Sequence, residues 1–206
     1  MSAQRSRLND SIAVLLFVFV MVGRPEAAVA QQDTLIFFGG AAVALGMHEA
    51  GHLVLDGVFD ASPGFKKVSF GPFPFFAITH APVSPAREFA ISSAGFWVQH
   101  ATDEVLLRSP RFREEGGPLL KGLLAFNVLA SVAYSGAAFT ETGPAERDTL
   151  GMAVSADVPE PIVGALILAP AAMDTVRFFR PQWTWAKWAS RAAKVGGALL
   201  VIKARS

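Results

Sequence analysis

Long apolar runs, separated by short charged stretches, divide this chain into segments of helix length. Residues 122–140 form a run of 19 uncharged residues, close to the ~20 that a helix needs to span a bilayer. Residues 34–59 are also of membrane-spanning length, and residues 161–173 are uncharged up to Asp174. We expect these three segments to be helices in a lipid environment.

The segments between these runs predict smaller elements. Residues 65–79 are rich in Phe, Val and Ile and are broken by Gly71-Pro72 and Pro74, which predicts a short hairpin or a re-entrant element. Ser84-Pro85 is typical of a helix start, so we expect an amphipathic helix over about 85–107. Residues 108–115 and 141–160 are predicted to be loops. Trp residues alternate with Lys and Arg over 183–194, which indicates a segment along the membrane surface.

The first thirty residues have the pattern of an export signal. Arg5 and Arg7 precede an uncharged run over 11–23, and an Ala-Val-Ala triplet ends at Ala30. We expect a signal peptide cleaved after Ala30 or, alternatively, a retained N-terminal anchor. Residues 31–206 then form a single membrane-embedded domain. The predicted fold class is an all-α membrane protein of about four to five embedded or interfacial helices, with the hairpin or re-entrant element after the first.

Composition narrows the chemistry that this fold can carry. The chain is 52% hydrophobic and only 17% charged, against about 25% charged in ordinary soluble domains. Its net charge of +1 and the lack of a long basic block argue against a nucleic acid partner. Because there is no cysteine, thiol catalysis and Cys-ligated zinc sites are excluded. Any metal must be held by His and carboxylate side chains.

One motif carries a specific chemistry, the H-E-x-x-H pattern His48-Glu49-Ala50-Gly51-His52. Two histidines four residues apart lie on the same side of a helix and can bind one metal ion. Zinc lowers the pKa of a bound water to around 7, and the adjacent Glu49 can act as the general base. The pattern therefore predicts a zinc-dependent peptide-bond hydrolase.

A catalytic zinc needs a third protein ligand, and the sequence offers several. Asp56 continues the helix stripe but lies about 12 Å along it from His48. The other candidates are His80, Glu88, His100 and Asp174. Asp174 is our first choice, because a carboxylate that ends an apolar run needs a partner or a function.

The motif in an apolar helix, the Phe-, Gly- and Pro-rich element after it, the Ala94-Gly95 helix and the later Asp174 resemble the site-2 protease family of intramembrane zinc metalloproteases. The resemblance covers residues 35–179. It implies that His48, His52 and Asp174 hold zinc and that Glu49 activates water. Gln99 stands where the family has an Asn, and is expected to hydrogen-bond substrate or the oxyanion. Asn127, the only amide in 122–140, is a second predicted substrate contact.

The sequence thus predicts a zinc endopeptidase that cleaves a membrane-associated protein within or near the bilayer, in a bacterial-type inner membrane. The hairpin is expected to bind the unwound substrate strand by edge pairing. One alternative is a non-proteolytic membrane protein that uses the same residues to bind metal or pack helices. A second, a soluble exported peptidase, is disfavoured by the uncharged run at 122–140.

Overall fold

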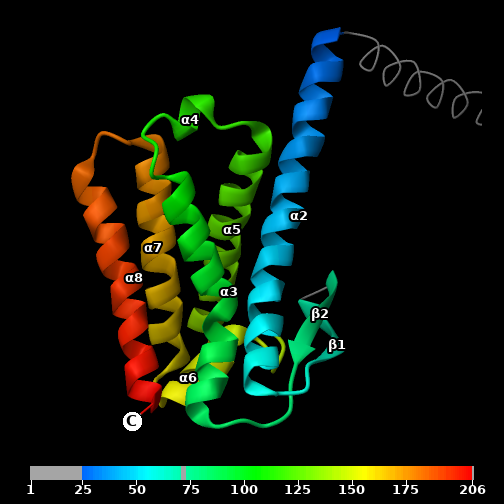
Figure 1. Ribbon diagram of the computed structural model, residues 1–206, viewed down its shortest axis with the longest axis vertical. Helices are drawn as coiled ribbons and strands as arrows, with labels where there is room; N and C mark the ends of the chain where they lie inside the picture. The colour runs from blue at the N-terminus through cyan, green and yellow to red at the C-terminus, as the bar shows by residue number, and fades with distance from the viewer. Residues whose placement is uncertain (1–24, 71–72, 206) are drawn as a thin grey trace, which may run out of the picture.

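Five long helices stand side by side, with a hairpin at one end of the bundle (Figure 1). The computed structural model describes residues 25–70 and 73–205, so most of the predicted signal or anchor segment lies outside the described residues. The long helices are α2 (Pro25–Phe59), α3 (Pro85–Leu106), α5 (Pro118–Thr140), α7 (Glu160–Phe179) and α8 (Thr184–Arg205). The remaining elements are α4 (Phe112–Glu115), α6 (Asp148–Ala156), β1 (Gly64–Phe70) and β2 (Phe73–Thr79).

Three helices are long and apolar enough to cross a membrane: Val29–Phe59 within α2, α5, and α7. Helix α2 exposes apolar side chains along its length, including Leu35, Phe38, Val54 and Val58. A row of exposed apolar residues on one helix is costly in water and ordinary in lipid. The predicted helical fold with a hairpin is confirmed, and its apolar helices indicate a membrane protein.

Helices α2 and α5 approach each other closely where two glycines face the partner backbone. A Cβ atom on Gly40 would lie 1.9 Å from the Leu119 carbonyl oxygen, and one on Gly122 would lie 1.9 Å from the Phe37 carbonyl oxygen. Neither position has room for a side chain. Membrane helices commonly pack closely where small residues lie at the crossing point.

The hairpin pairs β1 with β2 antiparallel, from Gly64 opposite Thr79 to Phe70 opposite Phe73. This confirms the hairpin predicted for residues 65–79, whereas the predicted break at Gly71-Pro72 lies outside the described residues. In this two-stranded sheet β2 has β1 as its neighbour on one edge only. Among the described residues, no further strand pairs with the other edge of β2.

Three features differ from the sequence prediction. Residues 148–156 form helix α6, although 141–160 was predicted to be a loop. Helix α7 continues through Pro170 and Asp174 to Phe179, so it is longer than the apolar run 161–173 that predicted it. Helix α8 runs alongside α7 (Figure 1), whereas the interfacial prediction placed the Trp-rich segment along the membrane surface. The tryptophans are nevertheless exposed, at Trp183, Trp185 and Trp188.

The core that supports the site lies where α3, α6 and α7 meet. Its buried side chains include Phe89 and Phe96 from α3, Met152 from α6, and Val163 and Ile167 from α7. This cluster fixes the short α6 against two long helices. The first residue of α6 is therefore held in a defined place.

Candidate metal centre

The two motif histidines lie on the inner face of α2, where His48 is 2% and His52 is 5% exposed. The Nδ1 atom of His52 is 2.8 Å from the carbonyl oxygen of Ile91 on α3. Because a carbonyl only accepts, Nδ1 carries the proton and Nε2 of the neutral ring presents its lone pair. A backbone carbonyl is a usual partner for the ring nitrogen of a metal-binding histidine that does not bind the metal.

A carboxylate from α6 completes the group. The Oδ2 atom of Asp148 lies 3.2 Å from His48 Nε2 and 3.4 Å from His52 Nε2, and the two Nε2 atoms lie 3.2 Å apart. Ligands at about 2.0–2.1 Å from a tetrahedral zinc lie roughly 3.3 Å from one another. Among the residues that the structure describes, these three form the one group of His, Asp or Glu side chains close enough to hold a metal ion. Their spacing and chemistry fit zinc.

Asp148 is positioned by its two sequence neighbours. The Arg147 guanidinium donates to both carboxylate oxygens of Glu160, at 2.7 and 2.6 Å, and the Thr149 hydroxyl donates to Oε1 of Glu160 at 2.6 Å. Glu160 is the first residue of α7, so these bonds tie the start of α6 to α7. The residues before and after Asp148 are thus anchored to one buried carboxylate.

The electrostatics of Asp148 favour an ionised ligand. Burial opposes ionisation, but the adjacent His52 and His48 rings hold the pKa of Asp148 well below its usual range. Asp148 also begins helix α6, where the helix dipole favours a negative charge. A carboxylate that stays ionised is ready to coordinate a cation.

His48 is held from behind by α3 and α5. A Cβ atom on Gly95 would lie 2.3 Å from the His48 ring, so this helix position has room only for glycine. Phe96 meets the ring edge to face at 5.4 Å, and Tyr134 stacks on it at 5.9 Å. The His48 Nδ1 atom is buried and has no hydrogen-bond partner. Packing therefore fixes the ring, and its Nε2 atom faces His52 Nε2 and Asp148 Oδ2.

Glu49 and His52 open onto a cavity of about 470 Å³. Residues 75–79 of β2 form one wall, and Ile91 and Ser92 of α3 contribute to another. Tyr134 and Asp148 also line it. The structure thus places the predicted general base, one histidine and Asp148 around a single space that is large enough for a peptide segment.

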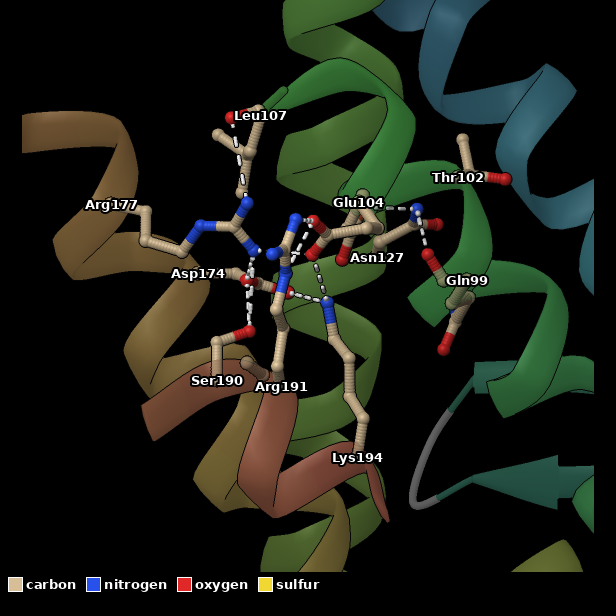
Figure 2. A network of polar contacts seen from close by, with 12 residues as sticks. Gln99, Thr102, Glu104, Leu107, Asn127, Asp174, Arg177, Ser190, Arg191 and Lys194 are labelled. Atoms are coloured by element: carbon tan, nitrogen blue, oxygen red, sulfur yellow. Dashed lines mark hydrogen bonds and ion pairs between the residues drawn. The ribbon is translucent and has the colours of Figure 1, made fainter. Parts of the chain in front are cut away.

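Asp174, the predicted third ligand, lies in a different polar network between α3, α7 and α8 (Figure 2). Its carboxylate accepts hydrogen bonds from Arg177 Nη1 at 2.9 Å and Ser190 Oγ at 2.6 Å, and pairs with Lys194 at 2.8 Å. Glu104 pairs with Arg177 and with Arg191 in the same network. The structure does not bring Asp174 to the histidines, and Asp148 takes the place predicted for it.

The two predicted substrate contacts also lie outside the cavity. Gln99 is 1% exposed, and neither side-chain amide atom has a hydrogen-bond partner. Asn127 donates from Nδ2 to Asp103 at 2.7 Å, which joins α5 to α3. Neither residue lines the space beside Glu49. The geometry gives Asn127 a packing role and leaves Gln99 away from the cavity.

The remaining candidate ligands are also placed. His80 and Glu88 line the cavity and face each other at 3.5 Å, but outside the His48, His52 and Asp148 group. Asp56 is fully buried, and its carboxylate oxygens have no hydrogen-bond partner. His100 is buried against Trp97 on α3. None of these four joins the histidine pair.

Asp148 was not among the predicted ligands, because residues 141–160 were predicted to be a loop rather than to begin helix α6. One local signal was present: Asp148 is followed by Thr149 and the mainly apolar stretch 150–154, a pattern that suits a helix start with an acidic first turn.

Comparison of the chain with protein-family models, curated proteins and solved structures finds no significant match. The resemblance to site-2 proteases therefore rests on the residues described above.

Proposed function

We propose that the protein is a zinc-dependent endopeptidase that hydrolyses a peptide bond of a membrane-associated protein within or near the bilayer, in a bacterial-type inner membrane. The observation that carries this proposal is the triangle of His48 Nε2, His52 Nε2 and Asp148 Oδ2, with edges of 3.2, 3.2 and 3.4 Å. Glu49 follows His48 directly in the chain and faces the adjoining cavity.

The three ligands would hold zinc, which lowers the pKa of a bound water to about 7 and polarises a carbonyl group. Glu49 then has the role of proton carrier. One of its carboxylate oxygens takes a proton as the water oxygen bonds to the peptide carbon. The same carboxyl group delivers that proton to the amide nitrogen as the C–N bond breaks. The products are a carboxylic acid and an amine, so one water is consumed.

The free edge of β2 gives the substrate a place to bind. Residues 75–79 line the cavity, and β1 covers only the opposite edge of this strand. An extended peptide can add to that edge through backbone hydrogen bonds, while Phe75, Phe76 and Ile78 contact apolar side chains. A substrate helix must unwind to pair in this way, because its own hydrogen bonds otherwise occupy its backbone groups. The proposed substrate is therefore an apolar segment in extended form.

The test compares wild type with Glu49→Gln on a membrane-anchored reporter, with zinc measured in the same preparations. We expect cleavage to fall by about 10²–10⁴-fold with zinc still near one per chain, because Gln cannot carry the proton. Glu114→Gln, an exposed change on α4, is the matched control and keeps wild-type activity. Activity retained in Glu49→Gln would overturn the role of Glu49. A wild-type protein that binds zinc but cleaves nothing would favour the non-proteolytic alternative.

A further inference from the structure

Peptide hydrolysis needs a hydrogen-bond donor for the carbonyl oxygen, which gains negative charge as water attacks. Gln99, the donor expected from the sequence, does not line the cavity. Ser92 lines it, but its hydroxyl donates to Glu88 at 3.0 Å. His80 faces the same Glu88 carboxylate. A neutral hydrogen-bond donor beside His48, His52 and Asp148 is therefore sought in another residue.

Tyr134 of α5 meets this need. It lines the cavity together with Glu49, His52 and Asp148. Its ring stacks on His48 with an interplanar angle of 24° and meets Phe96 edge to face at 5.1 Å. The carboxylates of Asp148 and Glu49 are both near enough to act on its phenol electrostatically. Two aromatic contacts therefore fix the ring beside His48, on the cavity that Asp148 also lines.

The position of that hydroxyl matters because the substrate carbonyl must come close to the same three ligand atoms. Because Tyr134 stacks on the His48 ring and shares the cavity with Glu49 and Asp148, its hydroxyl is the donor nearest a carbonyl group bound beside these ligands. Tyr134 is also the only tyrosine in the chain, so no other phenol can replace it. Tyrosine is among the side chains that serve as oxyanion donors in enzymes.

We propose that Tyr134 is a catalytic residue whose hydroxyl donates a hydrogen bond to the scissile carbonyl oxygen as that oxygen becomes an oxyanion. The phenol keeps its proton throughout, and Glu49 carries the transferred one. This inference rests on the proposed function, since it assigns a role in that reaction.

The first test is Tyr134→Phe, which keeps the ring and its contacts with His48 and Phe96. We expect kcat to fall by about 10²–10³-fold, with KM within a few-fold of wild type and zinc still near one per chain. Thr140→Val removes a hydroxyl from the exposed end of the same helix and should leave kcat unchanged. An unchanged kcat in Tyr134→Phe would overturn the proposal. Loss of zinc would also overturn it, because Tyr134 would then act by orienting Asp148.

A second measurement separates this inference from the proposed function. A phosphinate peptide mimics the oxyanion, and its affinity for the zinc-loaded protein can be measured without any cleavage. Tyr134→Phe should weaken phosphinate binding by about 10²-fold or more. Uncleaved substrate should bind with equal affinity to Glu49→Gln and to the double variant that carries both Glu49→Gln and Tyr134→Phe. Equal phosphinate affinity in wild type and Tyr134→Phe would contradict the oxyanion contact. Absence of cleavage by wild type would count against the proposed function instead.

Discussion

The Oδ2 atom of Asp148 lies 3.2 Å from His48 Nε2, although 100 residues separate the two in the chain. Three helices make this contact possible, because α2 carries the histidines, α6 carries Asp148, and α3 supports both from one side. The contact is what turns a two-histidine motif into a three-ligand site. The contact depends on the packing around His48 and, independently, on the packing around Asp148.

Gly95→Ala should displace His48 without touching any ligand atom. The new Cβ would lie 2.3 Å from the imidazole, which Phe96 and Tyr134 hold from other sides. We expect zinc affinity to fall at least about 10-fold, as for other changes that reorient a metal-binding histidine. Competition with a metallochromic chelator measures this affinity.

The matched control is Gly46→Ala on α2, where a Cβ meets nothing within 4 Å. This variant should bind zinc as wild type does, and the better helix propensity of Ala should keep it at least as stable. Equal zinc affinity in Gly95→Ala and Gly46→Ala would mean that the His48 ring is not confined as described.

Glu160→Gln should weaken zinc binding through Asp148, which it does not contact. The change removes the charge that holds Arg147 and weakens the acceptor for Thr149, so the start of α6 loses its anchor. We expect a loss of about 10–100-fold in zinc affinity, measured by the same competition. Zinc affinity within two-fold of wild type would show that α6 is positioned by its apolar core alone.

Much of this site follows from local spacing, and the rest depends on long-range packing. The i, i+4 spacing of His48 and His52 places both rings on one helix face, which a sequence shows directly. Asp148 could not be predicted in the same way, because a tertiary ion pair between Arg147 and Glu160 places it. Asp174 drew attention as a charge in an apolar run, but Arg177, Ser190 and Lys194 satisfy it. Two of these partners come from α8, a segment that the sequence assigned to the membrane surface.

Asp103 should make stability fall as pH rises from about 4 to 7. Burial raises its pKa to about 7, although the bond from Asn127 favours the charged form. An unfolded Asp titrates near 4, so between these values the folded protein holds the extra proton and is destabilised by increasing pH. Asp103→Asn removes this titrating group, so the free energy of unfolding should change less with pH, by a few kcal/mol at most. Thermal unfolding midpoints in detergent at several pH values measure this difference.

His100 acts in the opposite direction over part of this range. Burial lowers its pKa to about 4, so the unfolded chain binds more protons below about 6.5 and stability rises with pH there. This contribution is present in both proteins and cancels in their difference. Asp60→Asn, an exposed carboxylate change, serves as the control. An identical pH profile for wild type and Asp103→Asn would contradict a buried, protonated Asp103.

Zinc content in wild type, Asp148→Ala and Asp174→Ala tests the central claim most directly. Elemental analysis of the three purified proteins, after dialysis against a weak chelator, should give about one zinc per chain in wild type and in Asp174→Ala, and close to none in Asp148→Ala. Asp174→Ala is expected to be less stable, since it removes the more deeply buried of the two carboxylates that Arg177 and Lys194 share, yet it should keep the metal while folded. Equal zinc in wild type and Asp148→Ala, or loss of zinc in Asp174→Ala alone, would contradict the site described here.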